Sequence, residues 1–417
     1  MARAWFGSYG RIFGIRSYRL FWSGFTLSEL GDAMTRVALT WYVDESTKSA
    51  EALGWLLLAY SGPVIVGGLV AGQLLDRFDR RKVMLVDNLI RGAAVTAVPL
   101  LNSLGMLALW HIYLVAAVYG SLMMISLAGG PSLIPSLVPE EHLATANALE
   151  TLTFTLGGVA GPLLAGLLIA LVGAPSVLVL DAISYAVFAL ALASITLRPP
   201  DTGSMEAQGK TGTYRLGQVA LFAARNRILL STTLMFAAFN LGQGMLFVWL
   251  PVLAAGAPGG GPELYGALLG VWAAGEVAGS LLAGTLTLPL PLGTLICVAQ
   301  FLSGASMTLL LGGRSLWAAF GALALAGFFS APLTIWAQTL RMRIIPYNMR
   351  GRAFALLRTL MQSGPPIGGA IAGLLLPVLG LPALIGISAL LAGLPGLAGY
   401  GVPELREAGA PEVAHET

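Results

Sequence analysis

The sequence predicts an all-α integral membrane protein in which twelve transmembrane helices form two related six-helix bundles. Three observations predict this fold: the composition, the length of the apolar runs and an internal repeat. Of the 417 residues, 56% are apolar and 10% are charged, and the mean hydropathy is +0.80. Soluble domains carry about 25% charged residues, so a water-exposed globule of this size would lack the polar residues to cover itself. The net charge of +3 gives no reason to expect nucleic acid as a partner.

Twelve apolar runs are long enough to cross a bilayer, which takes about 20 residues per helix. The strands of a β-barrel would instead alternate in hydrophobicity over short segments. The predicted spans are 20–43, 53–75, 83–103, 107–129, 143–172 and 176–197 in the first half, and 228–255, 264–286, 292–311, 315–337, 351–379 and 381–400 in the second.

The basic residues predict the orientation of these spans. The N-terminal segment, the alternate loops that follow it and the C-terminal tail contain 18 of the 23 Lys and Arg residues. Because basic residues stay on the cytoplasmic side of a membrane, we expect both termini to be cytoplasmic. The apolar run after the first arginines is too long for a cleavable signal.

The two halves of the sequence resemble each other. Aligned pairs occur in the same order along both halves, with small drifts in offset that loop insertions would produce. The pairs are Tyr60 with Trp272 and Gly67 with Gly279 at an offset of 212, Asp32 with Asn240 at 208, and Gly157 with Gly364 at 207.

This repeat predicts an organisation in two bundles joined by a polar linker. The predicted parts are an N-terminal half 1–197, a cytoplasmic linker 198–227, a C-terminal half 228–400 and a cytoplasmic tail 401–417. Two homologous halves in one membrane chain favour transport by alternating access, with a substrate site between the halves.

The loop after the second span combines a glycine, an aspartate and a basic run at fixed spacing. Its key residues are Gly72, Asp76, Arg77, Asp79, Arg80 and Arg81. This pattern resembles motif A of the major facilitator superfamily, G-x-L-x-D-R-x-G-R-R, with Asp79 in place of the second glycine. The resemblance implies that Asp76 and Arg77 latch the cytoplasmic side when the transporter opens outward.

The fifth span contains Gly157, Gly161, Pro162 and Gly166. Glycines four residues apart let another helix approach closely, and Pro162 bends a helix because it removes a backbone donor. The arrangement resembles motif C, a signature of proton-coupled exporters in this superfamily, with Ala165 in place of one glycine. Ordinary packing of small residues would also produce such a pattern.

Charged residues within the spans are the strongest candidates for function, because each costs about 2.5–3.5 kcal/mol on insertion scales. Asp32 and Arg36 are four residues apart in the first span, so they share a helix face and can pair. We expect Asp32 to be the proton-coupling carboxylate. The alternative is a static ion pair with Arg36. Glu29, three residues before Asp32, is a second candidate.

Three other charged positions within the spans have different expectations. Glu276, in the middle of the eighth span, is either a proton or cation site or an interhelical hydrogen-bond partner. Asp87 and Arg91 are four apart near the start of the third span, and we expect this pair to be structural. For Asp181 we expect a hydrogen bond to a neighbouring helix.

Aromatic and neutral polar residues gather in the helices expected to line the cavity. Such a wall suits an amphipathic or cationic ligand held by stacking and cation–π contacts. The candidates are Tyr60, Phe236, Phe239, Asn240, Gln243, Trp272, Gln338, Arg358 and Gln362.

These features together resemble the macrolide-efflux and enterobactin-exporter-like drug:proton antiporters of the major facilitator superfamily. The first span, with Leu30-Gly31-Asp32 before Ala38-Leu39-Thr40-Trp41, resembles their LGD…LPW pattern, with Thr40 in place of proline. The resemblance implies a bacterial inner-membrane exporter of amphipathic small molecules or drugs, driven by protons. We expect a monomer whose partners are lipids, protons and the substrate.

No enzyme chemistry is indicated. One cysteine and three scattered histidines show no metal-ligand spacing, and the glycines before Lys210 lack P-loop spacing. We therefore expect no catalytic residue, no metal and no cofactor beyond the proton gradient. Two alternatives stay open: a dedicated exporter of a siderophore or lipid, and an uptake transporter, against which motif C argues.

Overall fold

The computed structural model describes residues 10–197, 216–285, 289–312, 315–346 and 350–410, and within these ranges it contains helices and no strand. The chain divides into two compact units, 1–203 with 254–270 and 204–253 with 271–417. Parts of the predicted linker (198–215) and tail (411–417) lie outside the described residues, so the predicted domain limits stay predictions.

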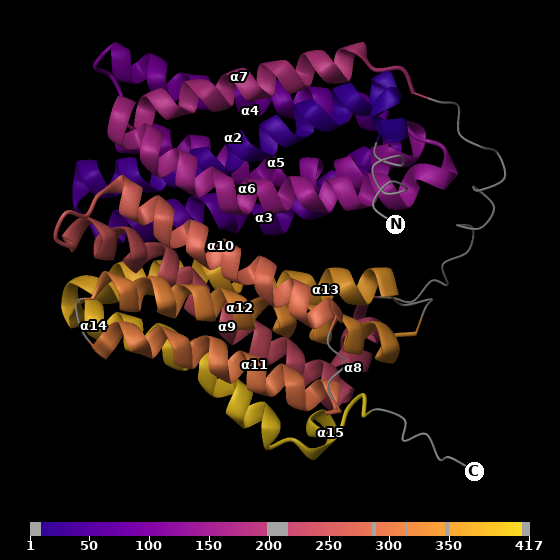
Figure 1. Cartoon of the computed structure of the whole chain (residues 1–417), viewed down its shortest axis with the longest axis vertical. Helices are drawn as coiled ribbons and strands as arrows, with labels where there is room; N and C mark the ends of the chain where they lie inside the picture. The colour runs from indigo at the N-terminus through magenta and orange to yellow at the C-terminus, as the bar shows by residue number, and fades with distance from the viewer. Residues whose placement is uncertain (1–9, 198–215, 286–288, 313–314, 347–349, 411–417) are drawn as a thin grey trace. The chain divides into compact units, whose positions relative to one another are not determined.

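The first unit is a bundle of long helices (Figure 1). Helix α2 packs against α6 and α7, α3 packs against α5, and α4 packs against both α5 and α7. The bounds are α2 Arg16–Thr47, α3 Ala50–Arg77, α4 Arg80–Ser103, α5 Leu109–Leu133, α6 Leu143–Val172 and α7 Ala174–Ser194.

The second unit is built in the same way, with α11 packed against α12 and α14. Two of its helices begin or end in the segment 254–270, which groups with the first unit. The bounds are α8 Leu216–Arg225, α9 Arg227–Gly256, α10 Pro262–Thr285, α11 Leu292–Met307, α12 Leu316–Ile344, α13 Arg350–Gln362, α14 Gly364–Tyr400 and α15 Pro403–Arg406.

The predicted spans agree with these helices. Nine stretches of the described chain are long and apolar enough to cross a membrane by length and composition alone. One of them, Leu356–Tyr400, contains two spans, because Gly380 interrupts α14. Helices α2 and α3, which are 32 and 28 residues long, are not among these nine stretches, and they coincide with the predicted spans 20–43 and 53–75. Within the described residues each of the twelve predicted spans therefore corresponds to a helical segment, and the predicted fold class is confirmed.

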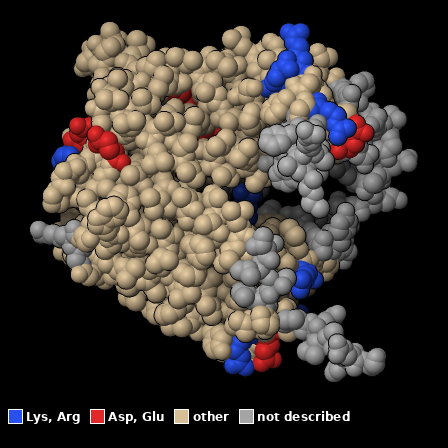
Figure 2. All heavy atoms as spheres, viewed as in Figure 1, with Lys and Arg blue, Asp and Glu red and all other residues tan. Residues whose placement is uncertain are grey.

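Large apolar side chains face outward along these helices. Leu171, Leu190 and Val378 are 70%, 68% and 78% exposed, which fits contact with lipid hydrocarbon. Charged side chains are few on the face drawn in Figure 2, where uncharged residues form most of the surface.

The last helix of each half begins at an equivalent glycine. Gly173, between α6 and α7, has a φ of +79°, and Gly380, 207 residues later, has a φ of +78°. Glycine adopts this left-handed region without the steric cost that a Cβ adds. A proline follows two residues after each glycine, at Pro175 and Pro382, where its fixed φ favours a helix start.

Close helix contacts in the first unit also depend on glycine. A Cβ at Gly67 of α3 would collide with the carbonyl oxygen of Ser121 on α5, and a Cβ at Gly120 of α5 would collide with that of Tyr60 on α3. The two backbones approach closely because neither position carries a side chain.

The second unit repeats this pair of contacts. Gly279 of α10 lies against the carbonyl oxygen of Phe328 on α12, and Gly327 of α12 lies against that of Trp272 on α10. Gly279 and Trp272 are the residues that align with Gly67 and Tyr60 of the first unit. The internal repeat seen in the sequence is therefore a repeat of helix contacts.

Candidate functional site

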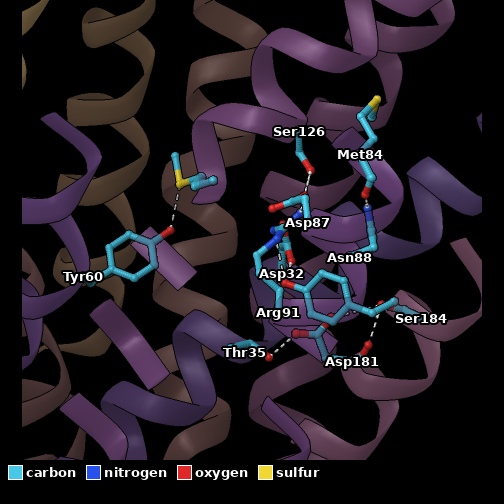
Figure 3. Close-up of polar contacts among 12 residues, drawn as sticks. Asp32, Thr35, Tyr60, Met84, Asp87, Asn88, Arg91, Ser126, Asp181 and Ser184 are labelled. Carbon is cyan, nitrogen blue, oxygen red and sulfur yellow. Dashed lines mark hydrogen bonds and ion pairs between the residues drawn. The ribbon is translucent and has the colours of Figure 1, made fainter. Parts of the chain in front are cut away.

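A buried arginine is the centre of the polar interior of the first unit. Arg91 lies on α4 and is 1% exposed. Its Nη1 donates to Oδ2 of Asp32 on α2 at 2.9 Å, and its Nη2 donates to Oδ2 of Asp87 on α4 at 2.8 Å. Figure 3 shows the guanidinium between the two carboxylates. Charge-assisted hydrogen bonds of this kind are stronger than neutral ones.

Hydroxyl groups from two further helices complete the network. Tyr185 of α7 donates to Oδ1 of Asp32 and accepts from Nη1 of Arg91 at 3.1 Å. Ser126 of α5 accepts from Nη2 of Arg91 at 2.5 Å and donates to Asp87 at 3.1 Å. The Arg91 guanidinium also lies 4.8 Å from the centre of the Tyr185 ring, within cation–π range. The network therefore joins α2, α4, α5 and α7.

The two carboxylates of the network depend on the same guanidinium. Asp32 and Asp87 share one cation, and a buried carboxylate without a cation is costly. Oδ1 of Asp87 has no hydrogen-bond partner among the described residues.

The ion pair between Asp32 and Arg36, which was the alternative to a proton-coupling role for Asp32, is not formed within the described residues. Asp32 pairs with Arg91, 59 positions along the chain, while the exposed Arg36 interacts with the hydroxyl of Tyr60 on α3. Packing between helices places Arg91 next to two carboxylates and the hydroxyl of Tyr185. Arg36 is only one turn from Asp32 on the same helix. The expected Asp87–Arg91 pair is present. Glu29 lies within electrostatic range of Asp32 and Arg91.

Sequence reasoning missed the hydroxyl groups of the network. Tyr185 and Ser126 lie in apolar helices, on different helices from the charges that they contact. One signal was present for α7: Asp181 and Tyr185 are four residues apart, so they share one face of an otherwise apolar helix. For Ser126, spacing along the chain offers no comparable signal.

The basic residues of motif A fasten the loop between α3 and α4. Arg80 donates to the carbonyl oxygen of Ser132 at 2.8 Å, and Arg81 donates to that of Ile195 at 2.7 Å. Asp79 caps α4, because its side chain accepts from the backbone N–H of Lys82 at 3.1 Å. Asp79 therefore has a structural use at the position where the family pattern has glycine.

The other motif A residues are less constrained. Gly72 is exposed and a Cβ there would meet nothing within 4 Å. Arg77 is exposed and lies 5.8 Å from the centre of the Phe78 ring. The side chain of Asp76 lies outside the described residues. The latch implied for Asp76 and Arg77 stays a prediction.

The residues of motif C are packing positions of α6. A Cβ at Gly161 would collide with Ala33 of α2, and a Cβ at Gly157 would press on the backbone of Glu29. Gly166 lies against Gly266 at the start of α10, and the carbonyl oxygen of Pro162 lies against the same residue. The motif thus holds α6 close to the segment of α2 that carries Glu29 and Asp32.

The second unit has a smaller polar site. Ser330 of α12 donates to Oε1 of Glu276 at 3.1 Å, and Trp272 also hydrogen-bonds this carboxylate. Asn240 of α9 donates to the carbonyl oxygen of Met361 at 2.9 Å. Glu276 on α10 therefore accepts an interhelical hydrogen bond from Ser330 on α12, which is one of the two expectations for this residue.

The remaining cavity candidates differ in exposure. Phe236 and Phe239 are buried at 6% and 3% exposure. Tyr60, whose hydroxyl lies 3.1 Å from Sδ of Met123, is half-buried. Gln243 and Trp272 are also half-buried, and Gln338, Arg358 and Gln362 are exposed. Their role as a substrate wall stays a prediction. In the described part of the chain no three His, Cys, Asp or Glu residues gather as metal ligands.

The fold and this buried charge network define a multi-pass membrane transporter. The family model described as "transmembrane secretion effector" matches residues 12–414. The chain therefore belongs to this family of major facilitator superfamily transporters. The crystal structure of a POT family transporter in complex with a thioalcohol-conjugated peptide has the same fold, with a TM-score of 0.70, 13% identity and coverage of 94% and 96% of the two chains.

Curated relatives are similar at a moderate level. An uncharacterised MFS-type transporter of Sinorhizobium fredii is 27% identical over 368 residues, which are 84% of this chain and 86% of the relative. The enterobactin exporter EntS of Citrobacter koseri is 27% identical over 346 residues, which are 81% and 80% of the two chains. An uncharacterised MFS-type transporter of Bacillus subtilis is 28% identical over 382 residues.

Proposed function

We propose that this transporter is a proton-coupled exporter of amphipathic small molecules, such as drugs or macrolides, that works by alternating access. It would lie in a bacterial inner membrane as a monomer, with both termini in the cytoplasm. The observation that carries the proposal is the buried Asp32–Arg91–Asp87 network. A carboxylate that shares its cation with a second carboxylate changes its partners when it binds a proton.

In the proposed cycle, Asp32 is the coupling group. A proton from outside binds Asp32 and releases it from Arg91, which stays with Asp87. The weakened contact between α2 and α4 lets the first unit change its packing. On the cytoplasmic side Asp32 loses the proton and pairs with Arg91 again. Glu29, near Asp32 on the same helix, and Glu276 in the second unit are further candidates for proton binding.

The direction of flux tests this proposal. Purified protein in liposomes would be given an acidic interior, with erythromycin, ethidium and enterobactin supplied outside as labelled probes. An antiporter accumulates its substrate inside as protons leave, and nigericin abolishes the accumulation by collapsing the gradient. Accumulation only under the opposite gradient would make the protein a symporter and contradict export. If no probe responds to either gradient, the multidrug proposal fails.

A dedicated siderophore exporter is the second candidate. The enterobactin exporter EntS relatives favour it, because they match more than four fifths of this chain. In the same flux assay, a dedicated exporter moves enterobactin and leaves erythromycin and ethidium outside. A multidrug exporter moves at least the two drugs.

A further inference from the structure

A third buried carboxylate lies beside the network, and the proposed cycle does not use it. Asp181 of α7 has 0% exposure. Its Oδ2 accepts from the hydroxyl of Thr35 on α2 at 2.5 Å, and its Oδ1 accepts from the hydroxyl of Ser184 at 3.0 Å. Within the described residues, no basic side chain comes within ion-pair distance of it. Figure 3 shows Asp181 between Thr35 and Ser184.

Helix α2 has a glycine, Gly31, at the position that faces the Asp181 side chain. A Cβ at Gly31 of α2 would collide with Oδ1 of Asp181 and would lie 2.6 Å from the hydroxyl oxygen of Ser184. Gly31 directly precedes Asp32, so the space that this glycine leaves for the Asp181 carboxylate lies beside the Asp32 position. Thr35 and Asp32 are three residues apart on α2, and Asp181 and Tyr185 are four apart on α7. Two hydrogen bonds therefore connect α2 and α7: the one between Thr35 and Asp181 and the one between Asp32 and Tyr185.

The charges of this region do not balance if every carboxylate is ionised. Asp32, Asp87 and Asp181 are buried, and Arg91 is the buried cation in contact with the first two. An isolated buried carboxylate costs so much that it takes up a proton instead. A protonated Asp181 fits its contacts, because a hydroxyl group can accept as well as donate.

We propose that Asp181 is a second proton-binding site of the transport cycle, protonated in the state described and deprotonated once per turnover. The inference extends the proposed function and rests on it for the transport step. Asp181 contacts Thr35 of α2 and Ser184 of its own helix, and it lies within electrostatic range of Asp32, Arg91 and Tyr185. Among these, Asp32 opposes ionisation of Asp181 and Arg91 favours it. When α7 and α2 separate, water would reach the carboxyl group and accept its proton.

Infrared spectroscopy of the protein in lipid vesicles tests the protonation without any substrate. The parent at neutral pH should show a carbonyl stretching band of a protonated carboxyl group that Asp181→Asn lacks. Thr35→Val and Ser184→Ala should keep the band and shift its frequency, because each removes one hydroxyl contact. The band should disappear as the buffer is made strongly alkaline. An identical band in Asp181→Asn, or a band unaffected by all three substitutions, would overturn the proposal.

The number of protons per substrate tests the second part. With any probe that the parent moves, the proton gradient that balances a known substrate gradient gives the coupling ratio. The Asp181→Asn variant should move one proton fewer per substrate than the parent and should still bind the probe. An unchanged ratio would make Asp181 a structural acid and would overturn its role in the cycle. If the parent shows no coupling, the proposed function fails, whereas the infrared result on Asp181 stands by itself.

Discussion

The two units have the same helix contacts and different polar interiors. Asp32 of the first unit aligns with Asn240 of the second at an offset of 208, and Asp181 corresponds to Ser388 at 207. Asn240 donates to a backbone carbonyl group, and Ser388 accepts from the indole N–H of Trp249 at 3.0 Å. The first unit thus has ionisable groups at positions where the second has neutral hydrogen bonds.

This difference separates what the fold requires from what the function requires. The glycines at the contacts between α3 and α5 and between α10 and α12 recur because close backbones exclude a side chain. The polar positions are free to differ, because a neutral hydrogen bond satisfies a buried group as well as an ion pair does. The ionisable side chains Asp32 and Asp181 are therefore particular to the first unit, which is where the proposed proton coupling lies.

The largest expected effect comes from replacing the central arginine. Arg91→Met should lower the free energy of unfolding by about 3–5 kcal/mol, because it leaves two buried carboxylates without a cation. Reversible unfolding in mixed detergent micelles measures the loss. The matched control is Arg341→Met in the second unit, since Arg341 is 3% exposed and contacts a backbone carbonyl group of Thr232. Arg341→Met should lower the free energy of unfolding far less than Arg91→Met, because it leaves no carboxylate without its cation. Equal losses would contradict the comparison.

Introducing a carboxylate at Asn240 of the second unit should have a smaller effect. Asn240→Asp places a carboxylate against the carbonyl oxygen of Met361, and losing this hydrogen bond at a half-buried site should cost about 1–3 kcal/mol. The same unfolding assay measures it, with Asp32→Asn as the reverse exchange. A variant as stable as the parent would show that the second unit tolerates a charge at this position and would weaken the contrast.

An effect of similar size is expected at the glycine beside Asp32. Gly31→Ala should cost about 1–3 kcal/mol, because the added methyl group overpacks the space of Asp181 and Ser184. Gly321→Ala on α12 is the control, since a Cβ there meets nothing within 4 Å. Gly321→Ala should leave the free energy of unfolding unchanged or raise it by up to about 1 kcal/mol, since alanine favours a helix. Thermal midpoints that fall equally in both variants would rule out a specific fit around Asp181.

Much of the fold could be predicted because hydrophobicity and repetition act along the chain. The apolar runs gave twelve spans, and Gly67 with Gly279 gave the repeat that the helix contacts confirm. The pair Asp87–Arg91 was also accessible, since a spacing of four residues places both side chains on one helix face. The break inside α14 at Gly380 agrees with the predicted boundary between 351–379 and 381–400.

The partners of Asp32 could not be predicted in the same way. Spacing along one helix favoured Arg36, whereas packing between helices supplies Arg91 and Tyr185. Which helix faces meet depends on three-dimensional contacts that a single sequence does not reveal. The burial of Phe236 and Phe239 has the same origin, because an aromatic residue in an apolar helix fits a cavity wall or a packed core equally well.

The most direct test of the account compares uphill transport with exchange in Asp32→Asn. Liposomes with the parent, with Asp32→Asn or with the control Glu407→Gln, which changes an exposed carboxylate outside the network, would be assayed for gradient-driven accumulation of a probe that the parent moves. The same vesicles would then be assayed for exchange of labelled against unlabelled probe without a gradient. We predict that Asp32→Asn keeps exchange and loses accumulation, whereas Glu407→Gln keeps both. Normal accumulation by Asp32→Asn would contradict the assignment of coupling to this network.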